Sequence, residues 1–156
     1  MKSVIIKTPL GFATIIGDCN GISSISVSDE ILIESNDYPQ ELETAVEQIQ
    51  NFFNGRLTAF SLSLNPTGTP FQQKVWRELA KIPYGTTISY LDLSKKLGHP
   101  KAIRAVAAAN GKNPLWIVVP CHRVIGSNGS LTGYAGGLAR KKWLLQHENS
   151  AQQSLF

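Results

Sequence analysis

The stretch that decides the fold is Ser89–Asn110, SYLDLSKKLGHPKAIRAVAAAN. Its composition predicts a short helix over Ser89–Leu97, a tight turn at Gly98-His99-Pro100 and a second, alanine-rich helix over Lys101–Asn110. Two short helices joined by a glycine-containing turn are typical of a helix-turn-helix. A plain helical hairpin with an alanine packing face explains the same stretch equally well, so the pattern alone leaves both open.

The second helix of this pair is unusual for a reader of the major groove. Half of its residues are alanine, Gly111 follows directly, and only Lys101, Arg104 and Asn110 carry long polar side chains. Small side chains permit close approach to a narrow groove, which favours docking in the minor groove with little sequence reading. Arg104 is long enough to enter a base stack and fill the place of an extruded base. The alternative for Arg104 is an ordinary surface arginine.

The segment before this pair predicts a separate α+β domain over residues 1–65. Turn residues separate three β-branched runs that predict a small antiparallel three-stranded sheet, and a helix then opens at Pro39 and ends before Gly55. Phe60–Leu64 alternates apolar and polar residues and predicts a half-buried strand. The three runs of the sheet are Ser3–Lys7, Phe12–Ile16 and Ile22–Val27.

The segment over residues 66–156 predicts a mostly helical second domain that contains the helix-turn-helix. Thr69 can cap a helix with Pro70 at its first position and Gln72 closing a capping box. The last helix is expected over Leu138–His147. It is basic, and Leu138, Trp143 and Leu145 are its expected anchors.

Charge is divided unevenly between these two domains. Residues 1–65 carry three Lys/Arg against eight Asp/Glu, whereas residues 66–156 carry twelve against three, for an overall net charge of +4. A strongly basic domain indicates a polyanionic partner, although uneven charge on a solvated surface is the competing explanation. No apolar segment is long enough to span a bilayer, no signal peptide is recognised, and two cysteines predict neither a disulfide framework nor a four-cysteine zinc site. We therefore expect a cytoplasmic protein, or a nuclear one in a eukaryote.

The chemistry-bearing string is Pro120-Cys121-His122-Arg123-Val124. The apolar run Ile117–Val119 before it predicts a buried strand, at the end of which Cys121 would lie at the rim of an accessible site. A thiol at a rim beside His and Arg can ionise, and the thiolate is the nucleophile. Taken singly, such a cysteine or histidine is more often an inert core residue.

Several strings around Cys121 together resemble the O6-alkylguanine-DNA alkyltransferases, the methylated-DNA–protein-cysteine methyltransferases. The resemblance runs from Thr69 to Glu148, and residues 1–65 resemble that family's amino-terminal domain only in layout. The strings that carry it are Arg104, Asn113-Pro114, Ile117 to Ile125, Gly129, Tyr134 to Leu138 and Lys142 to Glu148.

The resemblance implies single-turnover repair, in which Cys121 takes the alkyl group from O6-alkylguanine, and also from O4-alkylthymine, and is not regenerated. His122 would act through a water molecule as the base, and Glu148 would orient it. Asn113 would hold the turn behind the cysteine. Tyr90 would donate to guanine N3 as charge develops on the leaving base.

The resemblance also implies a set of residues that bind the substrate base or DNA. Arg104 would replace the flipped nucleotide, Tyr134 would wall the pocket, and the backbone carbonyls of Cys121 and Val124 would receive the exocyclic amine. The further members of this set are Ala135, Trp116, Ser127 and His99. The expected partner is double-stranded DNA bound by a monomer, with no cofactor, no metal site and no membrane.

Two alternatives remain open at this point. A catalytically silent sensor of alkyl damage would share the fold but lack the reactive cysteine. A cysteine hydrolase using Cys121 and His122 would turn over and would not need the basic domain.

Overall fold

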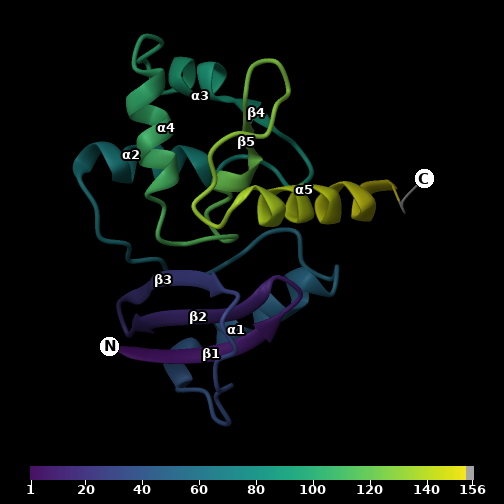
Figure 1. Ribbon diagram of the computed structural model, residues 1–156. Helices are drawn as coiled ribbons and strands as arrows, with labels where there is room; N and C mark the ends of the chain where they lie inside the picture. Colours follow the sequence, from purple (N-terminus) through teal and green to yellow (C-terminus); the bar gives the residue numbers. More distant parts are fainter. Residues whose placement is uncertain (154–156) are drawn as a thin grey trace. The chain divides into compact units, whose positions relative to one another are not determined.

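The computed structural model describes residues 1–153 and divides into two compact units. The first unit contains Met1–Thr67 together with the later segment Pro114–Val118. The second contains Gly68–Asn113 and the chain from Val119 on. Each unit has its own core (Figure 1).

The first unit is built on an antiparallel sheet of β1 (Lys2–Thr8), β2 (Gly11–Asp18) and β3 (Gly21–Ser28), in the order β1-β2-β3. Gly11 and Gly21 begin the second and third strands with φ values of 129° and 132°. A Cβ at Gly11 would lie 2.4 Å from the Ser28 carbonyl oxygen, so only glycine fits there. This confirms the predicted three-stranded sheet.

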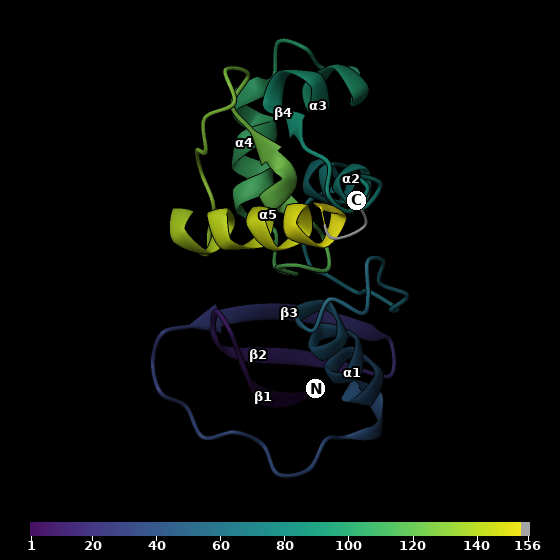
Figure 2. The ribbon, with the colours of Figure 1, turned by 90° about the vertical axis from the view of Figure 1, so that its right-hand side faces the viewer.

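Helix α1 (Gln40–Phe53) covers one face of this sheet, as Figure 2 shows. Its apolar residues recur at helical spacing and are buried, except for the half-buried Phe53 at its end; the alternate apolar residues of the strands are buried too. This complementary patterning makes the core of the unit. The helix contributes Leu42, Ala45, Val46, Ile49 and Phe52 to that core.

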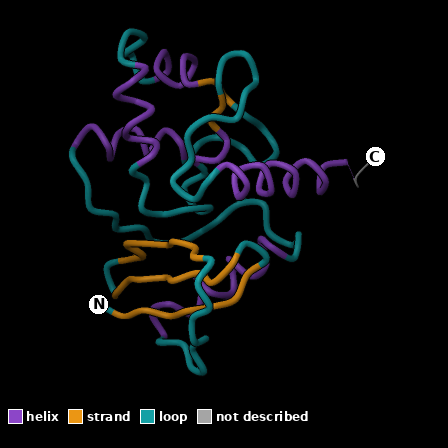
Figure 3. The backbone as a smooth tube through the Cα atoms, in the orientation of Figure 1, coloured by secondary structure: helices purple, strands orange, loops and turns teal. Residues whose placement is uncertain are grey.

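The predicted strand at Phe60–Leu64 is wrong. Only Leu64 pairs, in an isolated bridge to Ile22, and the rest of the stretch is loop (Figure 3). The backbone N–H of Ile22 donates to Ser63 O, and that of Asn65 donates to Ile22 O, both at 2.8 Å. The alternating segment therefore pairs with the edge strand β3 at a single residue and does not add a strand to the sheet.

The predicted buried strand at Ile117–Val119 is also wrong, although these residues are buried. The chain bends sharply there, because Val118 N–H donates to Trp116 O at 2.8 Å and Ile117 has a φ of 74°. Just before the bend, Leu115 forms an isolated bridge with Ile25 of β3. A short apolar run reports burial, and here the burial belongs to a turn.

The second unit is mostly helical and begins with α2 (Pro70–Leu79). The predicted capping box is present, since Thr69 accepts from the Gln72 N–H and the Gln72 side chain accepts from the Thr69 N–H. Trp76 of α2 donates through Nε1 to Ala109 O at 2.9 Å, which joins α2 to the next helical pair.

The helical pair consists of α3 (Tyr90–Lys96) and α4 (Ile103–Gly111), which pack against each other. Ser89 caps α3 by accepting from the Asp92 N–H at 3.0 Å. The two residues before α3 form β4 (Ile88–Ser89), which pairs in parallel with β5 (Val124–Ile125). This small ladder joins the start of α3 to the chain directly after Cys121-His122-Arg123.

The last helix, α5 (Leu138–Gln153), buries a different face from the expected one. Leu138 is 50 % exposed, whereas Lys141, Leu144 and Glu148 are at most 1 % exposed. Two of these three buried positions carry charge, so the apolar pattern alone pointed to the wrong face. No described helix is long and apolar enough to cross a bilayer. The α+β architecture with a sheet-containing first part and a helical second part is confirmed.

Candidate active site

Cys121 begins the short 3-10 turn η1 (Cys121–Arg123) and is buried, so the expectation of a thiol at a rim is wrong for the free protein. It is 1 % exposed. Burial raises the pKa of the thiol to about 11, and a hydrogen bond from Asn113 and the charge of Lys141 oppose this rise. The resting group is therefore a protonated thiol, and it needs a base to become a nucleophile.

Asn113 ties the chain before the bend to the chain after it. Its Nδ2 donates to Val119 O at 2.8 Å, and its side chain also hydrogen bonds to the Cys121 thiol. Asn113 is 3 % exposed, so these bonds form away from water. The arrangement holds the cysteine in place and stabilises its ionised form.

His122 and Glu148 form a buried hydrogen-bonded pair. The distance from His122 Nε2 to Glu148 Oε2 is 2.7 Å, and both residues are at most 1 % exposed. Burial lowers the pKa of His122 and Glu148 raises it, with burial the stronger effect. A neutral imidazole that donates to a carboxylate carries its proton on Nε2, which leaves the Nδ1 lone pair to accept. No described protein atom bonds His122 Nδ1.

Arg123 holds the same carboxylate from a second direction. Its Nε donates to Glu148 Oε1 at 2.9 Å and its Nη2 donates to Oε2 at 2.8 Å, while Nη1 donates to Ile82 O at 2.6 Å. Burial alone would raise the pKa of Glu148, but bonds from His122 and Arg123 lower it to about 2. The carboxylate is therefore a fixed anion. Arg123 lies within the string that drew attention to Cys121, yet sequence reasoning assigned it no role.

Tyr90 and Lys141 share two backbone acceptors. The Tyr90 hydroxyl donates to Thr132 O at 2.8 Å and lies 3.2 Å from Gly133 O, and Lys141 Nζ donates to the same oxygens at 2.7 and 3.3 Å. Burial lowers the pKa of Lys141 to about 8, opposed by Cys121. Sequence reasoning missed Lys141. The sequence did carry a signal for it: Lys141 lies three residues before Leu144 and seven before Glu148, a spacing that puts all three on one face of a helix.

A mostly apolar cavity of about 540 Å³ opens between α4 and the chain at residues 132–135. It brings together four of the residues expected to bind substrate or act on it. These are Tyr90, Arg104, Tyr134 and Ala135. Their companions in the wall are Ile103, Ala107, Gly111, Thr132 and Gly133.

Electrostatic coupling relates this cavity to the buried cysteine. An ionised Cys121 raises the pKa of Tyr90 and of Tyr134, in each case after the larger effect of burial. Lys141 acts in the opposite sense and lowers the pKa of Cys121. The thiol thus lies close enough to two phenols of the cavity wall and to one ammonium group for their charges to interact.

The remaining expected site residues do not line this cavity. Val124 is fully buried in β5, Ser127 is exposed in the turn that follows, and His99 is exposed beside Phe71 in the turn between α3 and α4. Trp116 belongs to the segment that packs with the first unit.

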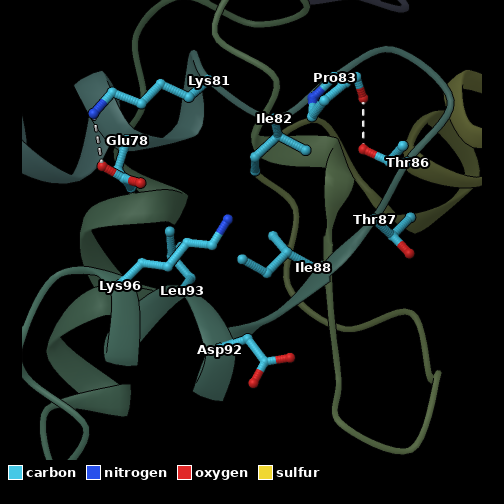
Figure 4. Close-up of a pocket in the computed structure, with 10 residues that line it drawn as sticks. All are labelled: Glu78, Lys81, Ile82, Pro83, Thr86, Thr87, Ile88, Asp92, Leu93 and Lys96. Carbon is cyan, nitrogen blue, oxygen red and sulfur yellow. Dashed lines mark hydrogen bonds and ion pairs between the residues drawn. The ribbon is translucent and has the colours of Figure 1, made fainter.

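A second cavity of the helical unit, of about 400 Å³, contains none of the expected site residues (Figure 4). Its wall carries the Glu78–Lys81 ion pair, at 3.2 Å, and the apolar side chains of Ile82, Ile88 and Leu93. Its lining contains no cysteine that could act as the nucleophile and no histidine that could act as the base. Among residues 1–149, whose side chains are described, no three His, Cys, Asp or Glu residues gather as a metal site.

Comparison with known proteins shows which proteins this chain is similar to. Residues 1–66 match the model "6-O-methylguanine DNA methyltransferase, ribonuclease-like domain", and residues 70–150 match "6-O-methylguanine DNA methyltransferase, DNA binding domain". The chain is 43 % identical to the methylated-DNA–protein-cysteine methyltransferase of Methanosarcina acetivorans, over 96 % of this chain and 99 % of that protein.

Solved structures agree with this similarity. The crystal structure of Mycobacterium tuberculosis O6-methylguanine methyltransferase superposes with a TM-score of 0.85 at 42 % identity, over 96 % of this chain and 93 % of the other. A crystal structure of Mycobacterium tuberculosis OGT in complex with DNA gives a TM-score of 0.84 at 42 % identity, over 94 % and 92 % of the two chains.

Proposed function

Because this chain belongs to the 6-O-methylguanine DNA methyltransferase family, we propose that it repairs DNA by moving the alkyl group of O6-alkylguanine onto Cys121. The carbon–oxygen bond to O6 breaks and a carbon–sulfur bond forms, so the base is restored and the protein is used once. The observation that carries this proposal is the buried His122–Glu148 pair, whose histidine directly follows the cysteine in the chain.

The base for the reaction is the neutral imidazole of His122. It takes the thiol proton through a water molecule at Nδ1, and Glu148 keeps the other ring proton on Nε2. The thiol needs this help, because burial raises its pKa to about 11. Asn113 and Lys141 favour the thiolate as it forms.

Tyr90 assists departure of the base. When the O6–carbon bond breaks, an electron pair stays on guanine and negative charge spreads over the ring. The Tyr90 hydroxyl, in the cavity wall, gives its proton to guanine N3 and thereby neutralises that charge. The proton that His122 received then returns to Tyr90 through solvent, and the guanine proton moves from N3 to N1 by exchange with solvent, which restores the ordinary base and balances the reaction. Tyr134 and Ala135 wall the bound base.

The duplex is expected to meet α4 through its minor groove. The exposed residues of this helix are Ile103 and Arg104 in its first turn, followed by the small residues Ala105, Ala108 and Gly111. A face of small residues permits close approach to the DNA backbone. Arg104 also lines the cavity, so it stands where it can replace a base that flips into the pocket. We propose that a single copy of the chain performs this step.

The two alternatives from the sequence are not favoured. A silent sensor would lack the acceptor thiol, and Cys121 is present. A cysteine hydrolase has no support from the relatives, which are named for methyl transfer to a protein cysteine.

An intact-mass experiment tests the proposal. The protein is mixed with an excess of oligonucleotide duplex containing O6-methylguanine, and we expect a gain of one methyl group on the peptide that contains Cys121. The matched controls are Cys121→Ser, which should gain nothing, and Cys19→Ser, which should react like the unaltered protein because Cys19 is exposed in the first unit. Continued turnover, or methylation at another residue, would contradict the proposal.

A further inference from the structure

Asn110, in the last turn of α4, is a buried polar residue that the mechanism above does not use. It is 2 % exposed, and its neighbours Ala107 and Gly111 line the cavity. No described atom bonds its Oδ1, which is buried as well. Burying a polar side chain costs free energy unless hydrogen bonds compensate for it, so the bond that the other end of this side chain makes is informative.

Asn110 makes a bond to Tyr90: its side chain hydrogen bonds to the Tyr90 hydroxyl. That hydroxyl already directs its own proton to the carbonyl oxygens of Thr132 and Gly133, so its lone pairs face the Asn110 amide. Asn110 is therefore the donor in this bond. The same bond lowers the pKa of Tyr90, against the stronger opposing effect of burial, as expected of a donor that favours the phenolate.

A donor at this oxygen matters when Tyr90 gives up its proton. As the phenol O–H bond breaks and the guanine N3–H bond forms, an electron pair stays on the phenol oxygen in a partly buried site. The nearby cation Lys141 is engaged with Thr132 O and Gly133 O, and Cys121 is a source of like charge. The side chains of Thr132 and Asn110 are thus the described groups that hydrogen bond directly to this oxygen, and of the two only Asn110 is a buried amide on α4.

We propose that Asn110 is a positioning residue for alkyl transfer, which aims the Tyr90 hydroxyl into the cavity and stabilises the negative charge left on its oxygen. This inference rests on the proposed function. It extends the proton-donating machinery from Tyr90 to the end of α4. It also accounts for an asparagine buried beside the cavity in an otherwise alanine-rich helix.

The test uses a substrate that cannot accept the proton. In O6-methyl-3-deazaguanine a C–H group replaces N3, so Tyr90 has nothing to protonate. We expect Asn110→Leu to slow single-turnover methyl transfer from O6-methylguanine in duplex roughly tenfold to a hundredfold, the usual effect of one hydrogen bond to a charged group. The rate on the 3-deaza duplex should stay unchanged, and Tyr90→Phe should show the same pattern.

Two further variants complete the test. Asn110→Asp keeps the shape but replaces the donor by an acceptor, so it should slow O6-methylguanine at least as much and again leave the 3-deaza duplex unaffected. Combined with Tyr90→Phe, either substitution should have no additional effect. The control is Asn149→Leu, the same change at an exposed position of α5, which should leave both rates unaltered.

Equal slowing of both substrates in Asn110→Leu and Asn110→Asp would overturn the inference, because a general loss of structure does not depend on N3. An effect that persists in the Tyr90→Phe background would overturn it too. Either result leaves the proposed function intact, provided that Cys121 of the unaltered protein still gains a methyl group. Failure of the unaltered protein to react with O6-methylguanine would instead refute the proposed function itself.

Discussion

Arg123 and Glu148 form a two-pronged ion pair inside the helical unit, with Nε–Oε1 and Nη2–Oε2 distances of 2.9 and 2.8 Å. The arginine side chain is 7 % exposed and the carboxylate side chain 1 %. Since Glu148 also accepts from His122, this pair joins the stability of the unit to the orientation of the proposed base.

Removal of the arginine should therefore cost much more stability than removal of a surface cation. Arg123→Leu leaves the Glu148 charge buried without its main partner, and breaking a buried pair in this way costs about 3–5 kcal/mol. Lys81→Leu breaks the partly exposed pair with Glu78 and should cost at most about 1 kcal/mol. Urea denaturation of both variants measures the difference. Similar losses of unfolding free energy in the two variants would mean that the buried pair stabilises the protein no more than the exposed one.

The low pKa of Glu148 predicts a specific sensitivity to acid. The folded carboxyl has a pKa of about 2, below its ordinary value of 4.5, so the unfolded chain binds this proton more readily. The stability that the carboxylate contributes is therefore complete above pH 4.5 and is lost as the pH falls toward 2. Thermal melting of Glu148→Gln should show a shallower decline of Tm across this window. The exposed Glu43→Gln is the control, and its profile should follow that of the unaltered protein.

Lys141 should influence the reaction itself. Lys141→Met removes the ammonium group that opposes the high pKa of Cys121 and that holds Thr132 O and Gly133 O. A nearby charge of this kind shifts a pKa by about one to three units, so we expect transfer from free O6-benzylguanine to slow about tenfold or more. Lys142→Met, the same change at the exposed neighbour, should not alter this rate. Quenching the reactions at set times and weighing the intact protein by mass spectrometry gives the transfer rate of each variant. An unchanged rate in Lys141→Met would show that Lys141 has no part in the reaction.

Arg104 should matter for duplex substrates alone. A flipped base leaves a gap in the stack that Arg104 is proposed to fill, whereas a free base needs no flipping. Arg104→Ala should thus slow repair of an O6-methylguanine duplex strongly and leave attack on free O6-benzylguanine nearly unchanged. Arg77→Ala, an exposed arginine of α2, controls for loss of one positive charge. Equal slowing on both substrates would refute the assignment.

Local patterns predicted much of this architecture correctly, because the features they report are short in range. The three β-branched runs, the Thr69 capping box and the two short helices around Gly98 all depend on neighbours within a few residues. The string Pro120–Val124 likewise identified the proposed nucleophile and base, since adjacent residues need no tertiary fold to be found together.

The failures share a physical cause. Ile117–Val119 and Phe60–Leu64 were interpreted as strands because they are apolar or alternating, but strand pairing depends on which edge the chain meets, and each meets β3 for a single bridge nearby. On α5, Lys141 and Glu148 are buried because distant groups bind them, so hydrophobicity could not place them on the inner face.

By itself the sequence determined the order of elements, the uneven division of charge and the position of the string that we propose to react, since these follow from composition and local spacing. Only the tertiary structure decided that Cys121 is a buried, protonated thiol, that Arg123 and His122 share one carboxylate, and that Asn110 and Lys141 surround Tyr90. Burial and hydrogen bonding between residues far apart in the chain shift the pKa values of Cys121, His122 and Glu148, and such partners exist only in the folded protein.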